Sequence, residues 1–295
     1  MLFTFLSLIA CAFLSTYVLF FPSLILSYKI GAIDIPNSRK MHALPTARAG
    51  GLSFFVVFST LLILSPVNLE LKIPLIFGGT TIFLVGFLDD SVSLSPIQKL
   101  AGQFSAASIY IFLEGEKPLA EGILTLIWLI FLSNATNLID GLNGLAGGIC
   151  TSESLCLAVI ALCIGNFNIF LCALILFGSV LGFLPHNFPK AKIFMGDCGA
   201  LFLGFTLAAL SSKLVFESQS ILCLLSTLLI FRVPTYDTNL SIVRRLIKGK
   251  NPLKADKEHF HHQLLKKGFT KECTTLALVT LSLIFGFIGI ILSVI

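Results

Sequence analysis

Four acidic residues stand where long apolar stretches of this sequence end: Asp89, Asp90, Asp140 and Asp197. Charged side chains in such places lose hydration and repel one another, so they persist together only where cations compensate them. Carboxylate oxygens suit Mg²⁺, with Mn²⁺ as a second choice, and Mg²⁺ in proteins usually binds a substrate phosphate as well. The four acids therefore predict a magnesium site with a phosphate-bearing ligand.

Basic residues and glycines complement these acids. Residues 232–273 carry ten Lys and Arg against four Asp and Glu, and they hold three of the five His. Glycines flank the acids at positions 141, 144, 147, 148, 196 and 199, and glycine lets backbone N–H groups approach an anion closely. Together these residues indicate a polyanionic phosphate ligand, and a site beside apolar segments also suits a lipid substrate.

Each feature alone has a simpler explanation. A single Asp at a helix end is usually a cap, and a basic loop of a membrane protein often touches only anionic lipid. Glycines in membrane helices ordinarily serve packing. The run HFHH at 259–262 lacks the nearby Cys and the spacing of a known zinc site. These explanations do not account for the location of the polar clusters, which all fall on one side of the predicted membrane spans.

The elements that must position these residues are membrane helices. The chain has 295 residues, of which 56% are hydrophobic and 12% charged, whereas a soluble protein has about 25% charged residues. We therefore expect one all-α, polytopic integral membrane domain over residues 1–295, with a long basic loop at 232–273. Apolar runs predict about ten transmembrane helices, at 3–27, 49–65, 74–88, 100–113, 119–133, 145–164, 167–184, 199–211, 219–231 and 274–295.

Ten spans divide the loops between two sides. One side receives 17 of the 20 Lys and Arg, and the other receives only Lys72, Lys117 and Lys213. The positive-inside rule makes the first side cytoplasmic and places both termini outside. Every polar cluster falls on this first side, so the sequence predicts one composite site at the cytoplasmic face of the membrane.

The motifs that form these clusters resemble those of one enzyme superfamily, the polyprenyl-phosphate N-acetylhexosamine-1-phosphate transferases of glycosyltransferase family 4. The resemblance runs from Asp34 to Gly268. It rests on DIPNSRKMH and PTARAGG, FLDDSVSLSPIQKLAGQ, NATNLIDGLNGLAGG, PHNFPKAKIFMGDCGALFLGF and RVPTYDTNLSIVRRLIKGKNPLKADKEHFHHQLLKKG. The HFHH form is closer to the branch that initiates O-antigen and teichoic acid synthesis than to the peptidoglycan branch.

The resemblance implies a role for each motif residue. Asp89, Asp90 and Asp140 would be catalytic, Asp89 accepting a proton from the lipid phosphate or holding it in line, and Asp197 would bind Mg²⁺. Substrate contacts are implied for Arg39, Lys40, Thr46, Lys99, Asn134, Asn137, Asn187, Arg244, His259, His261 and His262.

The implied reaction transfers HexNAc-1-phosphate, most often GlcNAc-1-phosphate, from a UDP-sugar to undecaprenyl phosphate, with release of UMP. The implied partners are UDP-N-acetylhexosamine, undecaprenyl phosphate and the lipid bilayer, with no nucleic acid and with a homodimer as an option. The implied location is the bacterial inner membrane, with the active site facing the cytoplasm.

Several alternatives stay open. The chain has Asn143 where many members have an acid, and Ala200 where Ser is frequent. A phospho-N-acetylmuramoyl-pentapeptide transferase of peptidoglycan synthesis is the alternative within the superfamily. A secondary transporter of a phosphorylated solute is the alternative of another class, although transporter sites lie near the bilayer midplane and commonly in matched halves. Direct attack and a covalent aspartyl intermediate are both compatible with these residues.

Overall fold

The computed structural model describes residues 2–35, 45–249 and 259–295. Within these ranges the chain forms α1 (Leu2–Ile30), β1 (Ile33–Asp34), β2 (Thr46–Ala47), α2 (Gly51–Leu64), α3 (Leu69–Val92), α4 (Pro96–Glu114), α5 (Leu119–Ile139), α6 (Leu145–Cys163), α7 (Phe167–Asn187), α8 (Gly196–Ser218), α9 (Ile221–Ile230), α10 (Arg232–Ile247), α11 (Phe260–Lys266) and α12 (Lys271–Ser293). The two short strands pair antiparallel, with Asp34 opposite Thr46.

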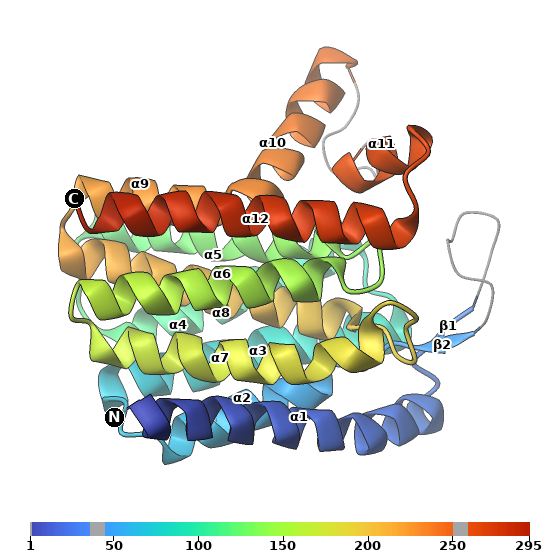
Figure 1. The fold of residues 1–295 in the computed structure, drawn as a ribbon, viewed down its shortest axis with the longest axis horizontal. Coiled ribbons are helices and arrows are strands. Elements are labelled where there is room, and N and C mark those ends of the chain that lie inside the picture. Colours follow the sequence, from blue (N-terminus) through green and yellow to red (C-terminus); the bar gives the residue numbers. More distant parts are fainter. Residues whose placement is uncertain (1, 36–44, 250–258) are drawn as a thin grey trace.

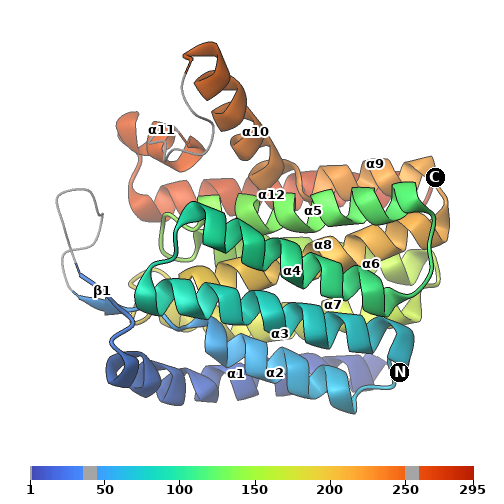
Figure 2. The same cartoon turned by 180° about the vertical axis from the view of Figure 1, so that it is seen from behind.

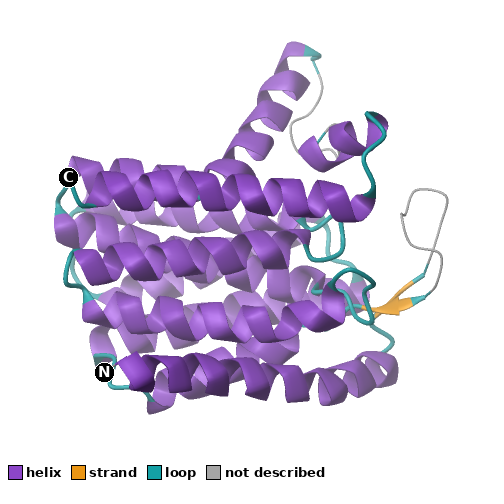
Figure 3. Cartoon of the chain, in the orientation of Figure 1, coloured by secondary structure: helices purple, strands orange, loops and turns teal. Residues whose placement is uncertain are grey.

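The long helices lie side by side, and Figure 3 shows how little of the described chain is not helical. Helix α8 is buried along almost its whole length and contacts α2, α3, α5, α6, α7 and α9. Figure 2 shows α3, α4 and α5 covering one face of the bundle. The N- and C-termini lie together at one end, whereas the β-hairpin and α11 lie at the other (Figure 1).

The expected all-α, polytopic membrane fold is confirmed, but the expected number of ten spans is not. Each predicted apolar run coincides with one helix, α1 to α9 and α12. Among the described residues, seven helices are long and apolar enough to cross a membrane, or up to eight if α9 and α10, which meet at a 75° bend, count as one. Helix α2 has only 14 residues, and the first turns of α4 carry Gln98, Lys99 and Gln103. Apolar runs locate helices, but they do not by themselves establish that a helix spans the bilayer.

A tight turn joins α3 to α4 at the end of the bundle that carries the β-hairpin. Ser95 and Gln98 form a reciprocal capping box, and Pro96 follows at the first position of α4. Asp89 Oδ1 accepts the Leu94 N–H at 2.7 Å, which holds the end of α3 to the turn. Local sequence therefore brings the end of α3 close to the first turns of α4.

A second connection ties the first loop to the start of α8. Ala47 bridges to Ile193, and Phe194 N–H donates to the Ala47 carbonyl oxygen at 2.8 Å. Gly50 N–H donates back to the Phe194 carbonyl oxygen at 3.0 Å. These backbone bonds place the segment between Ala47 and Gly50 beside the first turn of α8.

The three lysines predicted for the opposite side gather at the other end of the bundle. Lys72 lies in the first turn of α3, and Lys117 pairs with Glu114 in the connection from α4 to α5. Lys213, near the end of α8, lies 3.4 Å from Glu114 Oε1. For these three lysines the described structure therefore agrees with the division expected from the sequence.

Candidate active site

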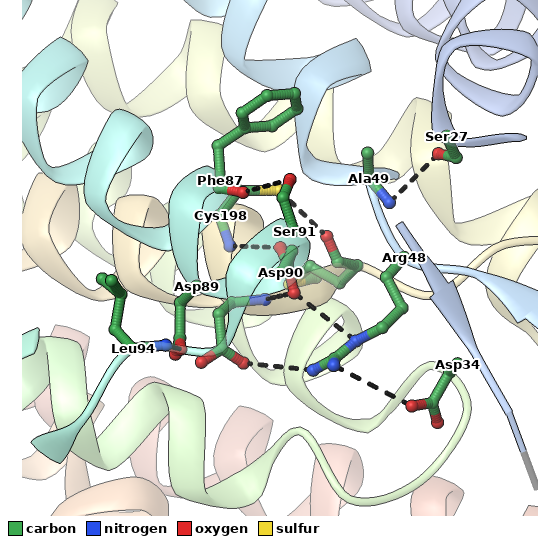
Figure 4. A network of polar contacts seen from close by, with 12 residues as sticks. Ser27, Asp34, Arg48, Ala49, Phe87, Asp89, Asp90, Ser91, Leu94 and Cys198 are labelled. Carbon is green, nitrogen blue, oxygen red and sulfur yellow. Dashed lines mark hydrogen bonds and ion pairs between the residues drawn. The ribbon is translucent and has the colours of Figure 1, made fainter. Parts of the chain in front are cut away.

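The four acids of the sequence analysis lie together at the end of the bundle that carries the β-hairpin. Asp89 and Asp90 are in the last turn of α3, Asp140 follows α5, and Asp197 is in the first turn of α8. Figure 4 shows Asp89 and Asp90 beside two further charged residues from the first loop, Asp34 and Arg48. The site thus draws on segments far apart in the sequence.

Lys99, in the first turn of α4, lies among these acids. Its Nζ is 2.9 Å from Asp89 Oδ2 and also pairs with Asp197 Oδ2. The hydrogen-bond network orients the Asn137 amide with its oxygen 2.9 Å from Lys99 Nζ and its nitrogen 3.3 Å from Asp197 Oδ1. The side chains of Lys99, Asp89 and Asp197 keep 17%, 14% and 19% of their surface exposed, which leaves an anion a route to the ammonium group.

Arg48 is a site residue that the sequence analysis missed, as is its partner Asp34. Its guanidinium lies 3.4 Å from Asp90 Oδ1, 3.6 Å from Asp197 Oδ1 and 3.8 Å from Asp34 Oδ1. Burial lowers the pKa of Arg48, but the carboxylates around it, Asp90 first, raise it further, so its pKa lies above the usual value. The motif PTARAGG could have indicated Arg48, because Arg48 is the one charged residue in it. The sequence analysis instead assigned substrate binding to Thr46 of this motif.

Asp90 connects α3 to the start of α8. Its Oδ1 accepts the Asp197 N–H and its Oδ2 accepts the Cys198 N–H, each at 3.0 Å. A carboxylate placed there satisfies free backbone N–H groups and is favoured by the helix dipole. The neighbouring Gly196 has a φ of +75°, and a Cβ there would collide with the Arg48 carbonyl oxygen. These contacts favour a positioning role for Asp90, because both of its oxygens are already bound by protein.

Asp140 has a different environment. It follows the last turn of α5 and keeps part of its surface accessible. Burial, together with repulsion from Asp197 and Asp90, raises the pKa of Asp140 to about 7, and Arg48 opposes this only in part. At neutral pH Asp140 is therefore only partly ionised, and additional positive charge nearby would favour its ionised form.

Two of the asparagines expected to bind substrate are engaged with protein groups. Asn134 and Gln103 exchange hydrogen bonds between α4 and α5, at 2.7 and 3.1 Å. Asn187 Oδ1 accepts the Gly144 N–H at 2.7 Å, and its Nδ2 donates to the Ile193 carbonyl oxygen at 2.9 Å. Asn187 thus joins the loop after Asp140 to the loop before α8, whereas Asn137 alone of these three faces Lys99.

Asn143 also has a structural partner. Its Nδ2 donates to the Pro189 carbonyl oxygen at 3.1 Å, and the backbone carbonyl oxygen of Asn143 accepts from Thr275 Oγ1 at 3.2 Å. An acid at this position could not donate the first bond. The nearby Gly147 and Gly148 face Leu184 and Val279, so these two glycines provide close helix packing rather than the expected anion contact.

The three histidines of the HFHH motif, His259, His261 and His262, lie around the start of α11. His259 is buried, with its Nδ1 2.7 Å from Asp237 Oδ2. His261 is also buried, and its ring faces Gly141, directly after Asp140. Burial and the neighbouring His262, at a ring separation of 4.2 Å, lower the pKa of His261 to about 4. His261 is therefore neutral at physiological pH.

Of the other residues expected to bind substrate, Thr46 is half-buried in β2 and Arg244 is half-buried on α10. Arg39 and Lys40 lie outside the described residues.

The donor set suits a magnesium ion that is shared with a phosphate. Among the described residues, no three His, Cys, Asp or Glu side chains form a metal site by themselves. Mg²⁺ needs only one or two carboxylates when a substrate phosphate supplies further oxygens. The described site has five carboxylates, from Asp34, Asp89, Asp90, Asp140 and Asp197, around two cationic side chains, Arg48 and Lys99. This excess of negative oxygen ligands fits a divalent cation.

Comparison with known proteins identifies the family. Residues 73–215 match the sequence profile of glycosyl transferase family 4. A protein of Bacillus subtilis (strain 168), named "Probable undecaprenyl-phosphate N-acetylglucosaminyl 1-phosphate transferase", is 36% identical over 285 residues, which cover 91% of this chain and 79% of that protein. The chain belongs to glycosyl transferase family 4.

Other relatives of this family 4 chain carry related names. A "Decaprenyl-phosphate N-acetylglucosaminephosphotransferase" of Mycolicibacterium smegmatis is 33% identical over 311 residues, covering 90% of this chain and 75% of the relative. An "Undecaprenyl-phosphate alpha-N-acetylglucosaminyl 1-phosphate transferase" of Thermotoga maritima is 34% identical over 265 residues, which cover 88% of this chain and 81% of the relative. The superfamily predicted from the motifs is thereby confirmed. The family 4 profile covers the four clustered acids, Lys99 and Asn137, whereas Arg48 and the histidines of α11 lie outside it.

Proposed function

We propose that this family 4 protein transfers N-acetylglucosamine 1-phosphate from UDP-N-acetylglucosamine to a polyprenyl phosphate, with undecaprenyl phosphate as the acceptor. The products are polyprenyl-diphospho-N-acetylglucosamine and UMP. The observation that carries the proposal is Lys99, held by Asp89, Asp197 and Asn137 at one end of a membrane helix bundle. The names of the relatives at 33–36% identity support the sugar and the lipid.

The reaction exchanges one phosphoanhydride for another. An oxygen of the polyprenyl phosphate attacks the β-phosphorus of the UDP-sugar, the bond from this phosphorus to the bridging oxygen breaks, and UMP leaves. The main barrier is repulsion between two phosphates, so positioned positive charge is the principal means of catalysis. Lys99 and Arg48 supply that charge in the described part of the site.

The four acids take separate tasks in this proposal. Asp197, with Asp140 beside it, would hold Mg²⁺, which would supply positive charge to the phosphates of the donor. Asp90 holds the first turn of α8, so it fixes the position of Asp197. Asp89, tied to Lys99, holds the acceptor phosphate in line or takes its proton. Since the second pKa of a phosphate monoester is about 6, much of the acceptor is already a dianion at neutral pH, and direct attack needs no covalent intermediate.

We place the site at the cytoplasmic face of a bacterial plasma membrane. The loops that the sequence assigns to the side of the site carry 17 of the 20 Lys and Arg, whereas Lys117 and Lys213 lie with Lys72 at the far end of the described bundle. By the positive-inside rule this distribution supports a cytoplasmic site.

The decisive assay uses purified protein in detergent with undecaprenyl phosphate and a panel of radiolabelled donors. The panel contains UDP-N-acetylglucosamine, UDP-N-acetylgalactosamine and UDP-N-acetylmuramoyl-pentapeptide, and Asp89→Asn is the matched inactive control. Wild-type protein should transfer label from UDP-N-acetylglucosamine to the lipid, and the Asp89→Asn variant should not. Preference for the pentapeptide donor would assign the chain to the peptidoglycan reaction instead, and no lipid product with any donor would refute the proposal.

The same assay tests the metal. Excess EDTA should abolish transfer, and Mg²⁺ should restore it, with Mn²⁺ as a weaker substitute. Full turnover in EDTA would show that Lys99 and Arg48 are sufficient without a divalent ion.

A further inference from the structure

Asp237, on α10, holds the beginning of α11. The residue is buried, with 3% of its surface exposed. Its Oδ2 lies 2.7 Å from His259 Nδ1, and its Oδ1 accepts the Phe260 N–H at 2.7 Å. Both carboxylate oxygens therefore bind the residues at which α11 starts, although 22 residues separate Asp237 from His259.

Two further contacts fix the same junction. The rings of Tyr236 and Phe260 stack at a centroid separation of 5.6 Å, and Ser241 Oγ lies 3.3 Å from His259 Nδ1. His259 occupies the N-cap position of α11 but makes no capping bond with its own side chain. Asp237 therefore provides from another helix the acceptor that an N-cap side chain usually supplies.

Helix α11 in turn contacts the loop that follows Asp140. His261, only two residues after His259, has 2% of its surface exposed. Its ring lies so close to Gly141 that a Cβ there would collide with Nε2. The chain of contacts thus runs from Asp237 through the start of α11 to the residue next to Asp140.

We propose that Asp237 is a positioning residue for the transfer reaction: by clamping His259 and the Phe260 N–H, it docks α11 so that His261 packs on Gly141 and fixes the loop that carries Asp140. This inference rests on the proposed function. Asp237 itself touches neither substrate nor metal in this scheme, and it acts through His259 and His261. His259 accordingly serves as part of the clamp rather than as a substrate ligand.

The clamp requires an acid. A carboxylate only accepts hydrogen bonds, so His259 must carry a proton on Nδ1. An Asn at position 237 would keep one acceptor for the Phe260 N–H, but its NH₂ group would face the His259 N–H unless the ring changed tautomer. Asp237→Asn therefore weakens half of the clamp, whereas Asp237→Ala removes all of it.

The first test compares kinetic constants per folded enzyme. Asp237→Ala should lower kcat roughly 10- to 100-fold, the loss typical of a displaced catalytic group, and Asp237→Asn should fall between this variant and wild type. The KM for UDP-N-acetylglucosamine should change less than kcat. The matched control is Thr238→Val, at a buried neighbour on α10 whose side-chain hydroxyl has no hydrogen-bond partner in the described part of the chain. Its rate should stay within about twofold of wild type, as expected when no bonded group is removed. Equal rates for Asp237→Ala and Thr238→Val, or a loss explained by unfolded protein in size-exclusion profiles, would overturn the proposal.

The second test needs no turnover. Hydrogen–deuterium exchange should become faster in Asp237→Ala at both 259–267 and 140–149, and it should not change in Thr238→Val. Faster exchange at 259–267 alone would show that α11 is not coupled to the Asp140 loop and would overturn the inference. If wild-type protein used none of the donors, the proposed function would fail, but this exchange experiment would still decide whether the clamp positions the loop.

Discussion

At the residue scale, two cations of different shape share the acids of the site. Lys99 offers a compact ammonium to Asp89 and Asp197, whereas Arg48 spreads its guanidinium over Asp34, Asp90 and Asp197. An ammonium is a point charge, and a guanidinium has five donors in a fixed plane. Arg48 is therefore suited to hold several carboxylates at fixed separations, while Lys99 can turn toward an incoming phosphate.

Arg48→Lys tests this division of roles. A lysine keeps the charge but cannot reach three carboxylates at once, so we expect transfer to fall about a hundredfold through misplacement of Asp197. The change is measured as initial rate of lipid-linked product per folded enzyme. If the rate of the Arg48→Lys variant stayed close to that of wild type, net charge alone would matter at this position.

Asp197→Asn and Asn143→Asp should differ strongly. Losing the proposed metal ligand should cost about a thousandfold in rate, because a bound metal supplies several kcal/mol of charge stabilisation. Asn143→Asp removes the donor to the Pro189 carbonyl oxygen, so it should cost about tenfold or less, the value of one or two hydrogen bonds. Both rates are taken at saturating Mg²⁺, with melting temperature as the folding control. Comparable losses in the two variants would contradict the assignment of Asp197.

At the element scale, helix ends rather than helix faces build the site. The end of α3, the start of α4 and the start of α8 meet through short turns and caps, and α11 is docked from outside the bundle. Such ends expose free backbone N–H and C=O groups, which must find partners when buried. Asp90 and Asn187 meet that need here, which explains why some polar residues of the motifs bind backbone groups rather than substrate.

The docking of α11 should depend on pH. The pKa of His261 is about 4 in the folded protein, against an ordinary 6.5, so the unfolded chain binds the proton more readily. The contribution of neutral His261 to the free energy of unfolding is therefore fully present above pH 6.5. It is lost as the pH falls toward 4, and the loss is at most about 3 kcal/mol. Melting temperatures between about pH 7.5 and 4.5, which bracket most of this range, should fall more steeply for wild type than for His261→Gln. Parallel curves for the two proteins would show that His261 does not titrate with folding.

The elements were largely predictable, whereas their long-range contacts were not. Apolar runs locate α1 to α9 and α12 because a bilayer requires continuous apolar surface. The short turn also makes it foreseeable that Asp89 and Lys99 lie close. Arg48 meets Asp90 and Asp197 only through the tertiary fold, and nothing in one sequence reports that contact. An asparagine likewise looks the same whether it faces a ligand, as Asn137 is expected to do, or a backbone group, as Asn187 does.

At the scale of the whole molecule, the bundle has two chemically distinct ends. One end gathers the acids, Arg48, Lys99 and the histidines of α11, and the other gathers Lys72, Lys117, Lys213 and nearby glutamates. Both chain termini lie at the second end (Figure 1). The membrane orientation of the entire protein can therefore be tested with one residue from each end.

Cysteine labelling provides that test. In a background without the native Cys, Gly249→Cys after α10 should resist an impermeant maleimide in intact cells and react after lysis. Glu116→Cys, in the connection from α4 to α5, should react in intact cells. Both positions are exposed, so reactivity reports the side of the membrane. Labelling of the Gly249→Cys variant in intact cells would reverse the proposed orientation.

The spread of the site along the chain, from Asp34 to His261, has a consequence for biosynthesis. Translation and membrane insertion proceed from the N-terminus, so the acids are in place before α11 and α12 exist. Until those last helices arrive, the Asp140 loop lacks its contacts with His261 and with Thr275. A nascent chain should thus remain inactive until insertion is nearly complete, because the loop that carries Asp140 is not yet fixed.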